Sequence, residues 1–188
     1  MPGRLKKFLL SVWEVVEVVF VATATVFLIR SFLVQPFLVS GASMEPNFSD
    51  GNYLIIDEIT YRFRSPERGE VVVFRFPKDP SVFFIKRIIG MPGDTVTIDA
   101  GRVTIFNAVY PNGRLLEEPY INSNTSRTNN VSVILGSDEY FVMGDNRDAS
   151  LDSRSFGPVK RSLIVGRTLF RGWPFDRIKR FTPPAYNL

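Results

Sequence analysis

An apolar run near the amino-terminal end sets the first limit on how this chain can fold. Residues 8–29 read FLLSVWEVVEVVFVATATVFLI, and three basic residues stand just before them: Arg4, Lys6 and Lys7. A helix needs about 20 mostly apolar residues to cross a bilayer. Basic residues beside such a helix favour the cytoplasmic side. We therefore expect a short cytoplasmic amino terminus and one membrane-spanning anchor within residues 1–35, followed by an extracytoplasmic domain over residues 36–188.

Two acidic residues, Glu14 and Glu17, interrupt this run. They lie near its cytoplasmic end, where a charge costs less than at the bilayer centre, and we expect an interfacial pair on one helix face. A cleaved signal peptide is an alternative, because ATA at 22–24 has the small-x-small pattern of a cleavage site. A surface-lying amphipathic helix is another. Hydrophobicity that continues to Phe37 and surrounds the helix after Glu17 favours the anchor.

Beyond Pro36, short β-branched and aromatic runs alternate with turn residues, which predicts strands. The expected strands cover residues 52–57, 70–76, 83–89, 95–99, 102–106, 139–143 and 163–170. DAG at 99–101 and PNG at 111–113 predict turns. We expect a mainly β fold of packed antiparallel sheets in a barrel-like arrangement. Polar residues 119–137 predict a loop or minor insertion, and the final FTPPAYNL predicts an irregular tail.

Histidine and cysteine are both absent from the chain. Their absence excludes the usual zinc ligand sets, Ser-His-Asp and Cys-His catalysis, and any disulfide. The formal charge of +4 comes from scattered basic residues that form no block. We therefore expect no metal, no cofactor and no nucleic-acid partner.

Any proton acceptor for catalysis must therefore be an Asp, a Glu, a Lys or the terminal amine. Lys86 is the one lysine inside a strongly apolar strand, VFFIKRIIG. Strand alternation puts Phe84, Lys86 and Ile88 on one face and Ile85, Arg87 and Ile89 on the other. Burial can lower a lysine pKa by several units from about 10.4, which would make it a usable base. A lysine at a sheet edge is the alternative.

The sequence SGASMEP, residues 40–46, offers Ser43 as a nucleophile. Its surroundings do not match the G-x-S-x-G elbow or the S-x-x-K pattern, since Glu45 and Pro46 occupy the required positions. On this local pattern alone, a turn serine remains the alternative.

A third stretch, MGDNRDASLDSRSFG at 143–157, alternates Asp with Arg. A calcium loop needs glycine at its sixth position, where Ser150 stands. The alternation instead predicts ion pairs and hydrogen bonds that orient a neighbouring group.

In this order, the apolar run, SGASMEP, FIKRIIGMPGD and GDNRDASLDSRSFGPV resemble the type I signal peptidases, membrane-anchored serine–lysine proteases. The resemblance implies a serine endopeptidase that removes signal peptides from exported preproteins at small-x-small sites, with preproteins and the lipid bilayer as partners. It implies that Ser43 is the nucleophile and Lys86 the general base. The supporting and substrate-binding residues that it implies are Ser150, which orients the lysine, the ion pairs Asp152–Arg154 and Asp145–Arg87, and the pocket residues Phe37, Val39, Phe84 and Ile85.

One position departs from some members of the family, in which a serine two residues before the nucleophile helps to hold the oxyanion. Gly41 stands there in this chain, and a serine occurs one residue earlier, at Ser40. The second oxyanion donor is therefore open. Two other functions are compatible with parts of the sequence: an anchored β domain that only binds a partner, and a serine–lysine autoprotease fused to a DNA-binding module. The apolar run and the lack of a helix-turn-helix pattern count against the autoprotease.

Overall fold

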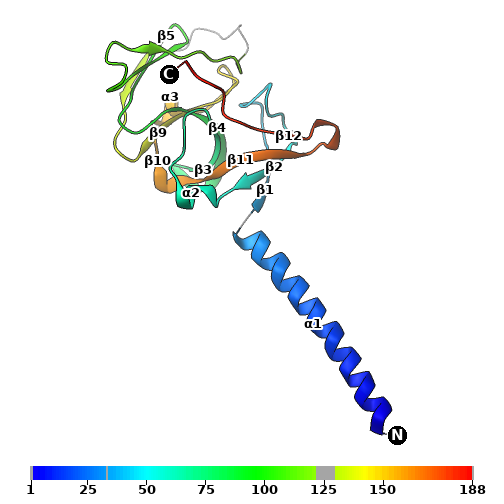
Figure 1. The fold of residues 1–188 in the computed structure, drawn as a ribbon. Coiled ribbons are helices and arrows are strands. Elements are labelled where there is room, and N and C mark those ends of the chain that lie inside the picture. Colours follow the sequence, from blue (N-terminus) through cyan, green and yellow to red (C-terminus); the bar gives the residue numbers. More distant parts are fainter. Residues whose placement is uncertain (1, 33, 122–129, 188) are drawn as a thin grey trace.

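The computed structural model describes residues 2–32, 34–121 and 130–187, and it places one long helix beside a β-rich body (Figure 1). Helix α1 spans Pro2–Phe32 and projects away from the strands, with the amino terminus at its far end. Apolar side chains along it, such as Trp13, Val18 and Phe20, are exposed. Over the described residues, we find no helix whose length and hydropathy would suit it to crossing a membrane.

An antiparallel sheet of eight strands forms the larger part of the body. Its hydrogen-bonded order is β1-β2-β11-β3-β4-β9-β10, with β12 pairing with β11. The strands are β1 (Val34–Leu38), β2 (Tyr53–Asp57), β3 (Val71–Phe76), β4 (Asp79–Gly90), β9 (Glu139–Met143), β10 (Val159–Lys160), β11 (Ile164–Trp173) and β12 (Lys179–Arg180). Strands β1 and β10 end the order, so within the described residues the sheet is open. The mainly β fold of antiparallel sheets is confirmed, and the described strands form no closed barrel.

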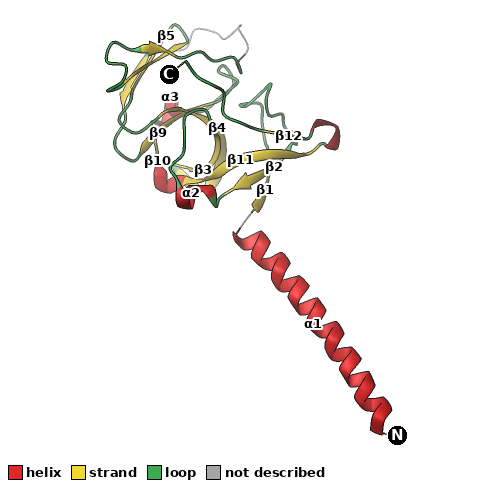
Figure 2. Cartoon of the chain, in the orientation of Figure 1, coloured by secondary structure: helices red, strands yellow, loops and turns green. Residues whose placement is uncertain are grey.

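A second, four-stranded sheet has the order β7-β6-β5-β8. Its strands are β5 (Thr95–Asp99), β6 (Arg102–Phe106), β7 (Arg114–Leu115) and β8 (Val131–Ile134). The predicted hairpin is present, because Ala100 and Gly101 take φ angles of 47° and 79° between the paired residues Asp99 and Arg102. Beyond α1, the helices among the described residues are the short segments α2 (Thr60–Phe63), α3 (Ser153–Phe156), η1 (Arg161–Leu163) and η2 (Phe175–Arg177) (Figure 2).

Strand β8 arises in a region that we predicted as a loop. Val131 and Val133 pack against the core of the small sheet, while Ser132 between them is exposed. The strand is too short for this alternation to stand out among the polar residues before it. The rest of that predicted loop, residues 122–129, lies outside the described residues.

Three apolar clusters fix how these elements pack. One joins the two sheets: Ile89, Phe141 and Met143 of the large sheet pack against buried residues of β5 and β6. A second lies on the large sheet around Phe74, Ile88 and Val142. The third collects Met44 and Phe48 together with residues of β2 and β3, and so attaches the segment after β1 to the sheet.

The carboxyl-terminal residues 181–187 form the irregular tail that we expected, but they are docked across both sheets. Phe181 packs on Phe48, with ring centroids 4.3 Å apart. Asn187 donates from its side chain to the carbonyl of Leu115 and accepts from the backbone N–H of Glu117. The tail therefore connects the segment near Ser43 with the small sheet.

Candidate active site

Ser43 lies in a tight turn between β1 and β2, and its neighbours hold the turn in place. Met44 and Phe48 are fully buried, and the Phe48 N–H donates to the Met44 carbonyl at 2.9 Å. Gly41 has a φ of 89°, a conformation that favours glycine, and its N–H donates to Asp50 Oδ1 at 2.7 Å. The buried side chains after Ser43 and the Gly41–Asp50 hydrogen bond before it therefore fix the backbone that carries the serine.

Lys86 reaches this turn from the middle of β4. Its Nζ donates to Ser43 Oγ at 2.7 Å and to the Ile85 carbonyl at 2.8 Å. The residue is only 4% exposed. Burial lowers the pKa of Lys86 to about 8, although the negative charges of Asp152 and Asp145 act to raise it. Because a free lysine titrates near 10.4, this site makes the neutral amine far more abundant at neutral pH.

A groove of about 440 Å³ opens over Ser43 and Lys86. Its apolar lining includes all four residues expected to bind substrate: Phe37, Val39, Phe84 and Ile85. One wall belongs to β1, which ends the sheet, and the other to residues 82–85 of β4. Within the described residues, this half of β4 pairs only with β3, since β9 joins from Arg87 onward. Both walls therefore present strand edges with unpaired backbone groups.

The structure contains both expected ion pairs behind the lysine. Arg87 binds Asp145 through two hydrogen bonds, Nε to Oδ1 at 2.8 Å and Nη2 to Oδ2 at 2.6 Å. Arg154 binds Asp152 in the same way, with two contacts of 2.8 Å. Asp152 Oδ2 also accepts from the Gly144 N–H at 3.0 Å. Each buried carboxylate near the lysine is thus paired with a guanidinium.

Ser150 does not make the hydrogen bond to Lys86 that we expected. Its Oγ is buried and has no hydrogen-bond partner among the described residues. The hydroxyl lies over Gly144, 2.3 Å from where a Cβ on that residue would be. Lys86 Nζ instead bonds Ser43 and its own strand. The orienting role that the resemblance implies for Ser150 stays a prediction.

Two residues of the GDNRD stretch approach Ser43 directly, and the sequence did not single them out. The Asn146 N–H donates to the Ser43 carbonyl, and its side-chain amide donates to the Ala42 carbonyl, both at 3.1 Å. Gly144 has no room for a side chain, because a Cβ there would lie 2.4 Å from the Ser43 carbonyl oxygen. In the sequence, Gly144 directly before Asp145 was the one sign that two backbone segments could approach each other closely here.

The hydrogen bond from Gly41 to Asp50 bears on the oxyanion donor. It commits the Gly41 N–H, which cannot then also bind an oxyanion. Within the described residues, the Ser43 N–H makes no hydrogen bond and is available. Ser40 lines the same groove as Ser43, so its side-chain hydroxyl is a candidate for the second oxyanion donor.

A serine hydroxyl bonded to a buried, weakly basic lysine can act as a nucleophile with its own base, which is the chemistry of a serine–lysine hydrolase. The sequence pattern described as "Signal peptidase, peptidase S26" matches residues 12–173. The chain belongs to this family of signal peptidases.

Three similar proteins illustrate the relationship. A probable signal peptidase I-2 from Synechocystis sp. is 40% identical over 84% of this chain and 71% of its own length. Signal peptidase IB from Staphylococcus aureus is 34% identical over 87% of this chain and 91% of its own. A crystal structure of a signal peptidase I from Enterococcus faecalis V583 matches with a TM-score of 0.46 and 30% identity, covering 55% of this chain and 97% of that one.

Proposed function

We propose that this protein is an endopeptidase that removes amino-terminal signal peptides from exported preproteins. The observation that carries the proposal is the 2.7 Å contact between Ser43 Oγ and Lys86 Nζ at the base of an apolar groove. Membership of the signal peptidase family supplies the substrate class.

In the proposed reaction, neutral Lys86 accepts the Ser43 proton as Oγ attacks the carbonyl carbon of the scissile peptide bond. The tetrahedral intermediate collapses when the leaving amine takes that proton from Lys86, and the mature protein departs. An acyl-enzyme on Ser43 remains. Lys86 then removes a proton from a water molecule, which attacks the ester and releases the signal peptide with a carboxylate end. The Ser43 N–H donates to the oxyanion in both steps.

The groove suits an extended substrate segment. A strand placed between β1 and the first half of β4 would find unpaired backbone groups on both sides. Alternate side chains of that strand would contact the apolar lining formed by Phe37, Val39, Phe84 and Ile85. Shallow pockets of this kind favour small side chains at the first and third positions before the cut.

Helix α1 serves as a single membrane anchor in this proposal, with the amino terminus in the cytoplasm and the catalytic domain outside. Its support is the apolar run of residues 8–29 behind basic residues. Exposed apolar side chains such as Trp13 and Phe20 are also costly to leave in water. The bilayer would then be a partner, and preproteins would reach the groove at the membrane surface.

The full-length protein in detergent, incubated with a preprotein that carries a small-x-small site, tests the proposal. We expect one new amino terminus, directly after the second small residue, found by sequencing the product. Ser43→Ala should abolish this cleavage, whereas the matched change Ser81→Ala, at an exposed position near the start of β4, should leave it intact. Full activity of folded Ser43→Ala would refute the proposed nucleophile.

A further inference from the structure

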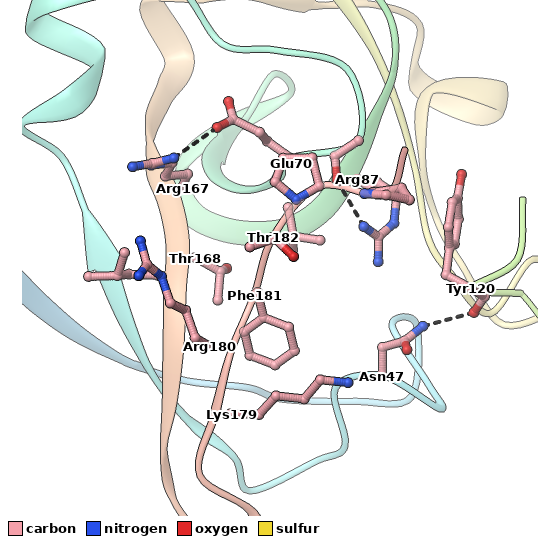
Figure 3. Close-up of a pocket in the computed structure, with 15 residues that line it drawn as sticks. Asn47, Glu70, Arg87, Tyr120, Arg167, Thr168, Lys179, Arg180, Phe181 and Thr182 are labelled. Carbon is pink, nitrogen blue, oxygen red and sulfur yellow. Dashed lines mark hydrogen bonds and ion pairs between the residues drawn. The ribbon is translucent and has the colours of Figure 1, made fainter. Parts of the chain in front are cut away.

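A second cavity lies behind the lysine, on the opposite face of β4. It has a volume of about 240 Å³ and lies between β11 and the carboxyl-terminal tail (Figure 3). Arg87, the residue after Lys86, forms part of its wall beside Tyr120 and Asn47. One partner of the ion pair behind the catalytic lysine therefore borders a space that could hold solvent.

The ring of Tyr120 covers the guanidinium of Arg87. The Arg87 Cζ lies 4.1 Å from the ring centroid, which is a close cation–π contact. The guanidinium also makes two hydrogen bonds to Asp145 and one from Nη1 to the Gly69 carbonyl at 2.9 Å. Hydrogen bonds therefore hold the edges of the Arg87 guanidinium, and the Tyr120 ring covers one of its flat faces.

The backbone of Tyr120 reaches the other partner of the ion pair through Asn47. The Asn47 side-chain amide donates to the Tyr120 carbonyl at 2.8 Å and to Asp145 Oδ2 at 2.9 Å. The first of these bonds is visible in Figure 3. Asn47 follows Ser43 by four positions in the same turn. One residue therefore touches Arg87 with its ring and, through Asn47, connects Asp145 to the segment of the nucleophile.

Tyr120 is itself held firmly. Its hydroxyl donates to Glu118 Oε1 at 2.6 Å and accepts from the Tyr186 hydroxyl at 3.0 Å. Glu118 is in turn paired with the buried Arg147. The ring meets that of Tyr186 edge to face, with centroids 6.2 Å apart. Because both its backbone and its ring are held in place, Tyr120 can restrict the positions of the side chains that it contacts.

We propose that Tyr120 is a positioning residue for the catalytic base. By covering one face of the Arg87 guanidinium, it fixes the segment of β4 from which Lys86 projects and limits the contact of the rear cavity with the ion pair. The inference rests on the proposed serine–lysine chemistry, and it adds a residue from the segment between the two sheets to the machinery of that site.

The charges around Lys86 determine in which direction its pKa should move when the Tyr120 ring is removed. Asp145 follows β9 and Asp152 precedes α3, and both act to raise the pKa of the lysine. Arg87 and Arg154 are their respective ion-pair partners. Removal of the Tyr120 ring would widen the contact between the cavity and the Arg87–Asp145 pair, so Lys86 would be less buried and Asp145 less tightly paired. Both changes favour the ammonium form, so the pKa of Lys86 would rise.

The test compares Tyr120→Leu, which removes the ring, with Tyr120→Phe, which keeps it, and with Tyr110→Leu as a matched control in a turn of the small sheet. For each full-length variant, kcat and KM for a preprotein are measured as a function of pH, together with thermal unfolding. In the wild type, activity should rise with pH through about 8, where Lys86 loses its proton. For Tyr120→Leu we expect this limb to move to higher pH, with kcat at pH 7 about tenfold lower and KM little changed.

Tyr120→Phe and Tyr110→Leu should both keep the wild-type limb. An unmoved limb in folded Tyr120→Leu would overturn the inference, as would an activity loss equal at every pH and matched by the unfolded fraction. If Tyr120→Leu does not fold, Tyr120→Met, with a longer flexible side chain, replaces it under the same criteria. Inactive Ser43→Ala beside a wild-type profile for Tyr120→Leu would refute this inference alone, whereas active Ser43→Ala would refute the proposed function.

Discussion

Lys86 and Arg87 are neighbours in one strand, are almost equally buried, and behave in opposite ways. Lys86 faces the groove, and no carboxylate of the described residues lies within hydrogen-bonding distance of it, so burial lowers its pKa. Burial also acts to lower the pKa of Arg87, but the hydrogen bonds and charge of Asp145 outweigh it and raise the value. A strand can thus hold two buried cations side by side when its alternation sends them to opposite faces.

The comparison distinguishes a residue that takes part in the proposed reaction, Lys86, from one that stabilises the structure, Arg87. On the groove face, a cation left without a counter-ion becomes a base at the cost of stability. On the rear face, a fully paired cation contributes rigidity and is inert. Substitutions on the two faces should therefore differ in which measurement they change.

Lys86→Met should give the largest effect and should act on activity alone. Removal of a general base typically costs about 10²–10⁴-fold in rate. Methionine keeps much of the side-chain length and removes a buried amine, so the melting temperature should be unchanged or higher. Preprotein cleavage and thermal unfolding measure the two quantities, with exposed Lys160→Met as the control. A large loss of stability in Lys86→Met would show that the groove face also supports the fold.

Asp145→Asn should act first on stability. It leaves the Arg87 guanidinium buried without its counter-ion, and breaking a buried pair from one side costs about 3–5 kcal/mol. Urea unfolding measures this cost, and exposed Asp99→Asn provides the control. A cost below about 1 kcal/mol, the range of surface pairs, would contradict the assignment of the rear face as support.

Tyr186→Phe should give the smallest effect. It removes one hydrogen bond, from the Tyr186 hydroxyl to Tyr120, and keeps both rings in contact. We expect a loss of about 0.5–1.5 kcal/mol in the free energy of unfolding and no change in the pH dependence of activity. Chemical denaturation and a pH profile of cleavage test both statements. A shifted profile would mean that the tail contributes to the position of the base as well as to stability.

The groove face was largely predictable from the sequence, because its signals are local. Lys86 stood out as the one lysine within an apolar strand, and the absence of histidine left few other bases. The order of the three motifs pointed to Ser43. Strands β5, β6 and β9 have the predicted bounds, since clear alternation between turn residues marks each of them.

The rear face was not predictable in the same way. Tyr120 meets Arg87 only because the segment after β7 folds back between two sheets, and no pattern within one element records such a contact. Strand β1 was missed because its Pro36 argues against a strand, although the position lies on the sheet edge, where proline is tolerated. The Ser150 contact was inferred from family resemblance, and its outcome depends on side-chain geometry that a sequence does not contain.

The lack of space around Gly144 limits which substitutions the protein can tolerate at this position. Every residue other than glycine carries a Cβ, and at this position that atom would lie 2.4 Å from the Ser43 carbonyl oxygen and 2.3 Å from Ser150 Oγ. Every missense change in its codon would therefore push the loop that carries Asp145 and Asp152 away from the serine. A screen of random mutants should accordingly recover no functional replacement at codon 144, even though the glycine itself has no side chain.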